Sequence, residues 1–498
     1  MAKYAACALL LPAAVLAASG DDQDGLFPSY VSLSFELIGF PDWAGTRAQP
    51  NEYSANMINN LVNIQGSPMI VRVGGNSADR AIYDKTLTTA TSRGCPNADK
   101  GAWQCIGTSF FDSYGAFPAG TLYSHNFNLA TWNSSGFDTL RDTVPLACNA
   151  LRGQLEVFEI GNEPDLFIPL RRPNTYTVAD YVDEWRNETT RFEKYLADAC
   201  PDMTENNKYM FPSVSSPGAR LRIPDIFKEG GDSLDKVTQV SAHNYMDGAT
   251  NPGVTLQKTL MNHTAVVRSI GGHVKYAKSY TAPNPDAKYI IGEHNSLYGG
   301  GAVGLSDVYG AALWGLDFSL YAASTQIIKR VHFHQSIGSP YADWAPTGPR
   351  QTKAPYYGKL AAATFLAHSD KIQVKTLAIG PRDDVDSGYA AYKGDKLSRV
   401  ALINLREYDS GSSAQRGSQT YTVGVPPRSR WVAQRLTAPG ARDKTGITYN
   451  GYAYEAESLG KPVRVQGLET DRVVRPDKNG KLSIEVADSE AVILVRSC

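Results

Sequence analysis

Residues 155–165 read LEVFEIGNEPD, and residues 288–295 read KYIIGEHN. Each stretch begins with a short apolar run, passes through a glycine and ends in a cluster of polar side chains. An apolar run of this length with a turn residue behind it is typical of a buried β-strand. In a barrel of parallel strands, the side chains that carry the chemistry follow the C-terminal ends of the strands. The two stretches therefore predict two buried strands, with Glu163 at the end of one and Glu293 at the end of the other.

The same alternation of apolar runs and helical patterns extends from about residue 30 to residue 368. Strands are predicted over residues 31–35, 69–73, 155–160, 208–214, 238–243, 288–292 and 330–333, with one more inside 111–127. Helices are predicted over residues 52–64, 178–199, 307–324 and 356–367. Strands and helices in such a series favour an α/β fold, a (β/α)8 TIM barrel over residues 21–368. The alternative, an open doubly wound sheet, usually has a glycine-rich turn after its first strand, and none follows residue 35.

The pattern changes after residue 369. Helical periodicity stops, and short runs of alternating apolar and polar residues follow at 389–392, 397–404, 420–425, 431–436, 482–486 and 491–495. Turn pairs such as Gly394-Asp395 and Asn479-Gly480 separate several of these runs, as in β-hairpins. We therefore expect a C-terminal antiparallel β-sandwich domain over residues 369–498. An additional sandwich strand is considered for residues 24–30, because they precede the first barrel strand.

The N-terminus has the pattern of an export signal. A basic start at Lys3 precedes an apolar stretch over residues 4–18, and small residues follow before Asp21. We interpret residues 1–20 as a signal peptide and expect a secreted, extracellular protein. The alternative is a membrane anchor, but an anchor needs about 20 apolar residues, so no membrane partner is expected after signal removal. Three sequons predict a glycoprotein: Asn133, Asn187 and Asn262.

Export also makes disulfide bonds possible. Cys95 and Cys105 flank a short loop, and Cys148 and Cys200 each lie near the end of a predicted helix. These are the pairs we favour, with Cys498 left over, although spacing alone does not fix the connectivity.

The charge balance limits the partners that the chain can bind. The chain has 498 residues, with 49 Lys and Arg against 50 Asp and Glu, and its net charge is −1. A chain this balanced has no overall positive field to hold a nucleic-acid backbone, so no nucleic-acid partner is expected. Nothing in the pattern indicates an oligomeric state or requires a cofactor.

Glu163 and Glu293 follow strands four and seven of the predicted barrel, which lie across the barrel mouth from each other. Two carboxyl groups that face each other across a cleft are what cleavage of a glycosidic bond requires. A second hypothesis is a metal-dependent hydrolase, because four histidines fall near the same strand ends: His243, His294, His332 and His334. No HExxH motif occurs, and no metal is expected. A third hypothesis, a non-catalytic secreted carbohydrate-binding protein, would usually have lost one of the two glutamates.

Three stretches resemble glycoside hydrolase family 79, the β-glucuronidases and heparanases: residues 71–77 (VRVGGNS), 159–165 (EIGNEPD) and 241–245 (SAHNY). A trailing β-sandwich also matches that family. The resemblance implies a retaining β-glucuronidase that releases β-linked glucuronic acid, with or without a 4-O-methyl group, from glucuronic-acid-containing glycans. It implies Glu293 as the nucleophile and Glu163 as the acid/base. The chain looks closer to secreted exo-acting β-glucuronidases than to heparanase, because it has no long basic linker.

Further residues near the strand ends are expected to bind the substrate: Asn76, Asn162, Tyr245, Tyr298, Gly300, His334 and Tyr341. Asn162 could bond the sugar 2-hydroxyl, a contact that strengthens in the transition state. Tyr245 could donate to the nucleophile and keep it ionised, or it could only pack at the barrel mouth. A carboxylate at C6 would be met by backbone N–H groups around Gly300 and by the hydroxyls of Tyr298 and Tyr341. The alternative is that residues 299–301 are simply a flexible loop.

Overall fold

The computed structural model describes residues 25–95 and 104–497. Eight parallel strands close into a barrel. In chain order they are β1 (Val31–Glu36), β2 (Ile70–Gly74), β6 (Leu122–Phe127), β7 (Leu155–Ile160), β8 (Tyr209–Val214), β9 (Val237–Gly248), β10 (Lys288–Tyr298) and β11 (Val331–Gln335). Each predicted barrel strand is present, and β1 pairs with β11 to complete the cylinder. The predicted TIM barrel is confirmed.

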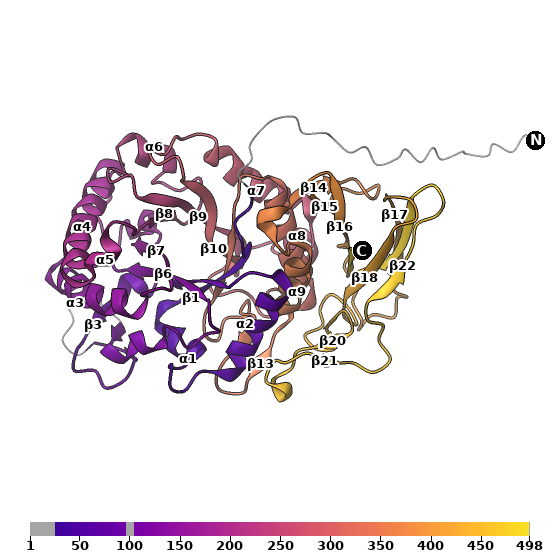
Figure 1. Cartoon of the computed structure of the whole chain (residues 1–498), viewed down its shortest axis with the longest axis horizontal. Helices are drawn as coiled ribbons and strands as arrows, with labels where there is room; N and C mark the ends of the chain where they lie inside the picture. The colour runs from indigo at the N-terminus through magenta and orange to yellow at the C-terminus, as the bar shows by residue number, and fades with distance from the viewer. Residues whose placement is uncertain (1–24, 96–103, 498) are drawn as a thin grey trace, which may run out of the picture.

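Helices on the outside of the barrel separate most consecutive strands (Figure 1). They are α2 (Glu52–Gln65), α3 (Ser134–Ala150), α4 (Val178–Ala199), α6 (Ile223–Lys228), α7 (His263–Ala277), α8 (Tyr309–Ser324) and α9 (Ala354–Phe365), with two short helices at α1 (Phe40–Ala44) and α5 (Pro201–Thr204). Helix α4 begins at a capping box, in which Thr177 and Asp180 bind each other's backbone N–H groups. Helix α8 is buried over most of its length, because the barrel covers one side and the C-terminal sheet contacts the other.

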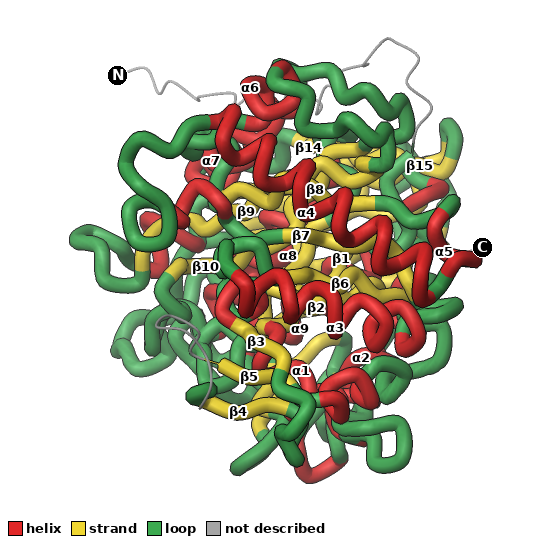
Figure 2. Tube along the Cα trace, turned by 90° about the vertical axis from the view of Figure 1, so that its left-hand side faces the viewer, coloured by secondary structure: helices red, strands yellow, loops and turns green. Residues whose placement is uncertain are grey.

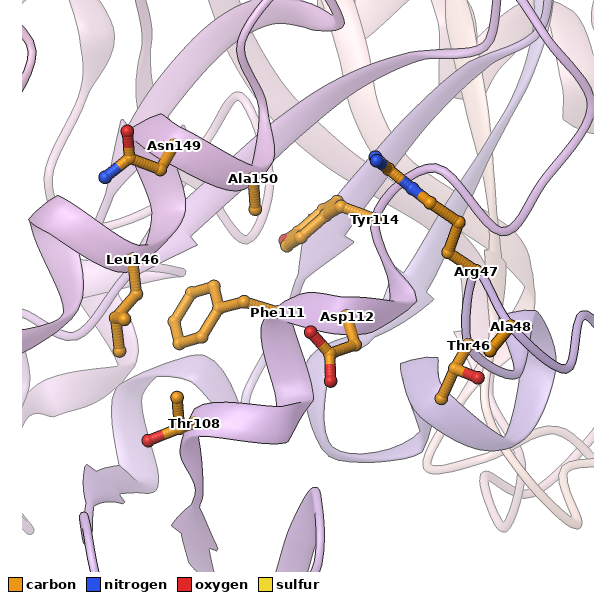
Figure 3. A pocket seen from close by; sticks show the side chains of 10 residues that line it. All are labelled: Thr46, Arg47, Ala48, Thr108, Phe111, Asp112, Tyr114, Leu146, Asn149 and Ala150. Carbon is orange, nitrogen blue, oxygen red and sulfur yellow. The ribbon is translucent and has the colours of Figure 1, made fainter.

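The connection between β2 and β6 departs from the regular alternation. Its described residues form a small sheet of β3 (Ala81–Tyr83), β4 (Thr91–Arg93) and β5 (Gln104–Ile106), followed by a 3-10 helix, η3 (Thr108–Ser113). Figure 2 shows this sheet at the outside of the barrel, and in Figure 1 its strand β3 lies on the left, away from the C-terminal sheets on the right. A cavity of 530 Å³ lies between η3, the segment before α2 and the end of α3, and Arg47, Phe111 and Leu146 are among its lining residues (Figure 3).

The C-terminal region is antiparallel throughout. Its large sheet contains β14 (Gln373–Leu377), β15 (Asp386–Lys393), β16 (Lys396–Asn404), β24 (Glu490–Ser497), β18 (Arg430–Thr437), β19 (Thr448–Tyr449), β20 (Tyr452–Ala453), β21 (Val463–Arg464) and β22 (Arg472–Val474). Its small sheet pairs β17 (Ser418–Gly424) with β23 (Lys481–Ala487). Side chains alternate along β16: Val400 and Leu402 pack between the two sheets, whereas Ala401 and Ile403 join the barrel core. The predicted β-sandwich is therefore confirmed, and the large sheet also covers the barrel helices.

Asp317 of α8 connects the barrel to the large sheet. Its fully buried carboxylate accepts a hydrogen bond from the Tyr389 hydroxyl at 2.6 Å and another from Ser387, both on β15. His263, which begins α7, places Nδ1 2.9 Å from the same carboxylate. Buried carboxylates are costly unless they are bonded in this way, so the contacts hold the two domains in one arrangement.

The sandwich strand considered for residues 24–30 is wrong for the described part of that segment. Residues 25–30 contain no strand. The backbone N–H of Phe27 donates to the carbonyl of Lys329 at 3.0 Å, and its ring packs on Val157, Met210 and Ile290. Those three apolar side chains lie in the N-terminal halves of β7, β8 and β10. Phe27 therefore covers the end of the barrel core opposite the predicted site.

Two disulfide bonds match the favoured pairs. One joins Cys95 to Cys105, and the other joins Cys148 in α3 to Cys200 at the end of α4. Cys498 and the expected signal peptide over residues 1–20 lie outside the described residues. Within 25–95 and 104–497, no helix combines the length and the apolar character that a membrane crossing needs.

Candidate active site

Glu163 and Glu293 both lie toward the C-terminal end of the barrel, at strands four (β7) and seven (β10). Glu163 follows β7, as predicted. Glu293 lies inside β10 rather than after it, because β9 and β10 remain paired past the barrel, up to Gly248 and Tyr298. This extension depends on the partner strand, so the local apolar run over residues 288–292 could not indicate it.

A β-bulge at Gly292 sets the direction of the Glu293 side chain. Ile291 pairs with Ala242 and Glu293 pairs with His243, so Gly292 is one extra residue in the ladder. Bulges of this kind re-aim the side chain that follows them. A Cβ atom on Gly292 would lie 2.2 Å from Oγ of Ser241. A larger residue at this position would therefore have to displace the Ser241 side chain of the neighbouring strand β9.

Glu163 has a left-handed backbone, with φ 47° and ψ 56°. This conformation is uncommon for a residue with a Cβ and persists where the surroundings hold it. Here the N–H of Glu163 donates to the carbonyl of Ser213 at 2.9 Å, and a 3-10 helix, η4 (Pro164–Phe167), starts directly behind it. Its Oε1 lies 2.9 Å from Nδ1 of His243. Contacts from β8 and β9 thus fix the orientation of this carboxyl group.

Arg72 of β2 is fully buried beneath the two glutamates. Its Nη1 donates to Oε2 of Glu293 at 2.8 Å, and its Nε and Nη2 donate to the two oxygens of Glu159 at 2.7 and 3.0 Å. The planar guanidinium suits such paired bonds. Burial acts to lower the pKa of Arg72, but Glu159 and Glu293 outweigh it and raise that pKa. Arg72 is therefore a permanent cation beside Glu293.

Glu293 is held as a carboxylate. Its Oε1 accepts a hydrogen bond from the Tyr245 hydroxyl at 2.8 Å, while Oε2 accepts the bond from Arg72. Burial acts to raise the pKa of Glu293, but His334, His243 and Arg72, with the hydrogen bond from Tyr245, bring it below its usual value. Glu293 is therefore ionised across the neutral range.

Glu163 has the opposite tendency. Burial, the charge of Glu293 and the charge of Asp165 raise its pKa well above the usual value. Burial also lowers the pKa of His243 to about 4, so that its ring is neutral at pH 7 beside Glu163. One ligand atom from each of Glu163, His243 and Glu293 lies within 4.8 Å of the others. Two close carboxyl groups whose pKa values are driven apart can serve as a proton donor and an anion.

His334 of β11 joins Glu36 to Glu293. Its Nε2 lies 3.1 Å from Oε2 of Glu36, and its Nδ1 lies 3.5 Å from Oε2 of Glu293. Burial acts to lower the pKa of His334, but Glu293 and Glu36 outweigh it and raise that pKa. Glu36 is missing from the predicted set, although it ends the first strand and the strand-end rule applies to it as well.

Asn162 lies just below the cavity, with 2% of its surface exposed. Its Oδ1 accepts a hydrogen bond from Arg72 at 2.7 Å, and its Nδ2 donates to Oδ1 of Asn76 at 3.2 Å. Its backbone N–H donates to Asp79 at 2.7 Å. Burial raises the pKa of Asp79 to about 6, although the N–H donors around it act in the other direction. In this structure Asn162 therefore connects Arg72 to Asn76.

A cavity of 620 Å³ brings these groups together. Both glutamates line it, and so do six of the seven predicted binding residues: Asn76, Tyr245, Tyr298, Gly300, His334 and Tyr341. Lining residues outside the predicted set are Glu36, Leu166, Ser215, Ser216, Asn244, Gly299, Ser336 and Ser339. They also come from loops and strand ends at this side of the barrel. Their position after strand ends could indicate from the sequence that they line the site, but their residue types do not distinguish them from ordinary loop residues.

Of the four histidines considered for a metal site, only His334 lines this cavity; His243 contacts Glu163, and the other two point elsewhere. The ring of His294 packs against Phe318 and Phe333, with centroids 4.6 and 4.0 Å apart, and His332 faces a backbone carbonyl inside the barrel. Glu163, His243 and Glu293 come close enough to share an ion. However, Arg72 and Tyr245 already bond both oxygens of Glu293. A divalent cation would also meet the charge of Arg72, so this set suits acid–base chemistry better than metal binding.

Comparisons with known proteins find relatives that match most of the chain. The model of the glycosyl hydrolase family 79 C-terminal beta domain matches residues 388–493. A beta-glucuronidase of Aspergillus niger is 41% identical over 492 residues, which span 93% of this chain and 90% of the relative. A beta-glucuronidase of Neurospora crassa is 39% identical, over 89% of this chain and 88% of the relative.

Solved structures share the fold. A 4-O-alpha-L-rhamnosyl-beta-D-glucuronidase from Fusarium oxysporum has a TM-score of 0.75 at 24% identity, and the match covers 96% of this chain and 98% of the other. A GH51 arabinofuranosidase from Xanthomonas axonopodis pv. citri has a TM-score of 0.61 at 16% identity, over 95% and 98%. The fungal relatives match nearly the whole chain at about 40% identity, and the chain therefore belongs to glycoside hydrolase family 79.

Proposed function

We propose that this glycoside hydrolase releases β-linked glucuronic acid with retention of anomeric configuration. The observation that carries the proposal is the close pair of Glu163 and Glu293, whose pKa values are driven in opposite directions. An inverting enzyme separates its carboxyl groups by about 6.5–9.5 Å to admit a water molecule, and a retaining enzyme holds them closer. The glycone is inferred from the names of the fungal relatives, which are beta-glucuronidases.

In the first step, an oxygen of Glu293 attacks the anomeric carbon and the glycosidic C–O bond breaks. Glu163 transfers its proton to the leaving oxygen, so the leaving group departs as a neutral alcohol. In the second step, the Glu163 carboxylate takes a proton from water, whose oxygen attacks the same carbon and frees Glu293. The charge of Glu293 helps to raise the pKa of Glu163. That charge is lost in the covalent intermediate, so the pKa of Glu163 falls. Glu163 therefore stays a carboxylate after it has given up its proton, and it can act as the base in the second step.

The carboxylate of the sugar needs its own donors. The cavity lining contains no Lys or Arg among the described residues. We propose that Tyr298, Tyr341 and the backbone N–H groups of residues 299–301 bind this carboxylate. Asn251 donates to the Tyr298 hydroxyl at 3.1 Å, so the tyrosine's own proton can be donated to a ligand. Gly300 has φ 90°, a conformation that favours glycine and lets the backbone approach an anion.

We also propose that the enzyme is exported and acts on glucuronic-acid-containing glycans, with or without a 4-O-methyl group. The signal pattern over residues 1–20 supports export. Among the sequons, Asn187 is exposed on α4, where an attached glycan would extend into solvent. N-terminal sequencing of protein from the culture medium, with a mass shift after deglycosylation, checks both points.

The test of the activity is a pair of aryl β-glycosides that differ only at C6. The glucuronide should be hydrolysed far faster than the glucoside, and proton NMR should show the β-anomer as the first product. An α-anomer formed first would contradict the assigned mechanism. Comparable rates on both substrates would contradict the glycone.

A further inference from the structure

The leaving-group side of the cavity is set by the position of Glu163. The acid must lie beside the glycosidic oxygen that it protonates, so the leaving group occupies the side that Glu163 faces. Lining residues on that side come from the loops after β7 and β8: Leu166, Ser215 and Ser216. The N–H of Glu163, directly after β7, donates to the carbonyl of Ser213 near the end of β8, so the two loops start side by side.

Leu166 presents an apolar side chain to this part of the cavity. It is 55% exposed, whereas its neighbours Pro164, Asp165 and Phe167 are buried. Its N–H donates to the carbonyl of Glu163 at 2.8 Å, which fixes it in the turn of η4. A single exposed leucine is common on protein surfaces, but Leu166 also lines the cavity that contains Glu163. Leu166 is therefore placed to contact whatever group is attached to the sugar.

The side chains around Leu166 in the cavity lining include no permanent cation. Both oxygens of Asp165 are bonded to Ser215, one through its backbone N–H at 2.9 Å and the other through its hydroxyl. The acidic and basic side chains in the cavity lining are His334, Glu36, Glu163 and Glu293, and Glu293 is the carboxylate held ionised. An anionic leaving group would meet these carboxyl groups, and none of the described lining residues is a Lys or Arg that could pair with it.

We propose that Leu166 is a specificity-determining residue of the leaving-group subsite and that it selects leaving groups with an uncharged, apolar ring face. A neutral sugar or a phenol offers such a face without a charge, whereas a sulfated sugar or a second uronic acid carries an anionic substituent beside it. The inference rests on the proposed function, because it takes Glu163 as the acid.

The test uses two aryl β-glucuronides, one with a methyl ester and one with a carboxylate at the same ring position, and a further ring substituent on the carboxylate compound matches the acidity of the two phenols. The wild type should prefer the ester in kcat/KM by about 10-fold or more. Leu166→Lys should reduce that preference at least about 10-fold, because it places a cation beside the leaving group. The matched control is Leu170→Lys: Leu170 is 89% exposed nearby in the chain but does not line the cavity, so the ratio should stay within about twofold.

The readout is the ratio of kcat/KM for the ester to kcat/KM for the carboxylate. A lysine near Glu163 also lowers the pKa of that acid and slows the hydrolysis of both substrates, and the ratio cancels this common effect. Equal effects of Leu166→Lys on both substrates, or an equal shift of the ratio by Leu170→Lys, would overturn the proposal. A wild type that hydrolyses the matching glucosides but neither glucuronide would refute the proposed glycone instead, and the ester-to-carboxylate ratio on glucosides would still test Leu166. A glucuronide of a neutral sugar and one of a uronic acid form the second pair, and Leu166→Lys should narrow the preference for the neutral sugar as well.

Discussion

The hydroxyl of Tyr245 lies 2.8 Å from Oε1 of Glu293, on the oxygen that Arg72 does not bond. Burial raises the pKa of Tyr245 well above its usual value, so the hydroxyl stays protonated and acts as the donor. Oε1 of Glu293 therefore accepts a hydrogen bond from a neutral hydroxyl, and Oε2 accepts one from a charged guanidinium. Hydrogen bonds to a carboxylate favour its ionised form, which is the form that a nucleophile needs.

We predict that Tyr245→Phe lowers kcat/KM by about 10- to 100-fold. A hydrogen bond to a charged group contributes about 1.5–3 kcal/mol, and its loss raises the pKa of Glu293. The group must be ionised to react, so the acidic limb of the pH profile of kcat/KM should move to higher pH. A slower enzyme with an unchanged acidic limb would indicate that Tyr245 only packs against the site.

The roles of the two glutamates are tested by azide. Glu163→Ala removes the proton donor, so activated aryl glucuronides should still form the covalent intermediate, and azide should speed its breakdown and yield a β-glucuronyl azide. Glu293→Ala removes the nucleophile, so any azide product should have the α configuration. The product configuration is read by NMR, and the exchange of these two results between the variants would mean that the roles are reversed.

Much of the barrel is predictable because its signals are local. The bounds of β7 and α4 agree with the predicted residues 155–160 and 178–199, since an apolar run and an amphipathic helix need no distant partner to be recognised. Helix α3 is not among the predicted helices. It contains Pro145 in its interior, and proline is unfavourable inside a helix. The extension of β9 and β10 depends on their mutual pairing, and only the fold supplies that information.

The site is predictable to a similar degree. Glu163 and Glu293 are part of recognisable motifs, and most of the expected binding residues lie just after strand ends. These positions are all on one side of the barrel, so the residues meet in one cavity. The contact between Arg72 and Glu293 joins strands two and seven, which no sequence spacing indicates. His294 sits one residue after Glu293, and strand alternation turns it away from the cavity toward Phe318. Proximity in the chain is thus a poor guide at this position.

The bulge at Gly292 leads to a prediction about packing. Gly292→Ala should destabilise the enzyme by about 1–3 kcal/mol, because the new Cβ overlaps Oγ of Ser241 and overpacking carries a cost of that size. Activity should also fall, since the shifted strand carries Glu293. Thermal unfolding and kcat measure the two effects.

The double variant with Ser241→Ala is the matching control. The Ser241 hydroxyl has no hydrogen-bond partner in the structure, so its removal alone should change stability little. It should restore at least half of the stability lost in Gly292→Ala, because it removes the atom that the new Cβ meets. No recovery would show that the bulge itself, rather than the contact with Ser241, requires glycine.

The basic limb of the pH profile should report Glu163. Its pKa is raised in the folded enzyme, and the first step needs the protonated form, so activity should fall as the pH rises through that pKa. Asp165 contributes to the shift. Asp165→Asn removes a negative charge, which should lower the pKa of Glu163 and move the basic limb to lower pH by several tenths of a unit to about one unit. Asp138→Asn, on an exposed site in α3, should leave both limbs in place, and a basic limb that Asp165→Asn does not move would assign it to another group.

The last prediction concerns the charge of the sugar. Tyr298 is 51% exposed and lines the cavity beside the glycines of residues 299–301, with its hydroxyl oriented by Asn251. If that hydroxyl donates to the sugar carboxylate, Tyr298→Phe should raise KM for the aryl glucuronide and lower its kcat/KM by about 10- to 150-fold, the value of one hydrogen bond to a charged group. The matched glucoside has no carboxylate at C6, so its weak hydrolysis should change little. An equal loss on both substrates would show that Tyr298 shapes the cavity without binding the charge, and the recognition of the carboxylate would then rest with Tyr341 and the backbone around Gly300.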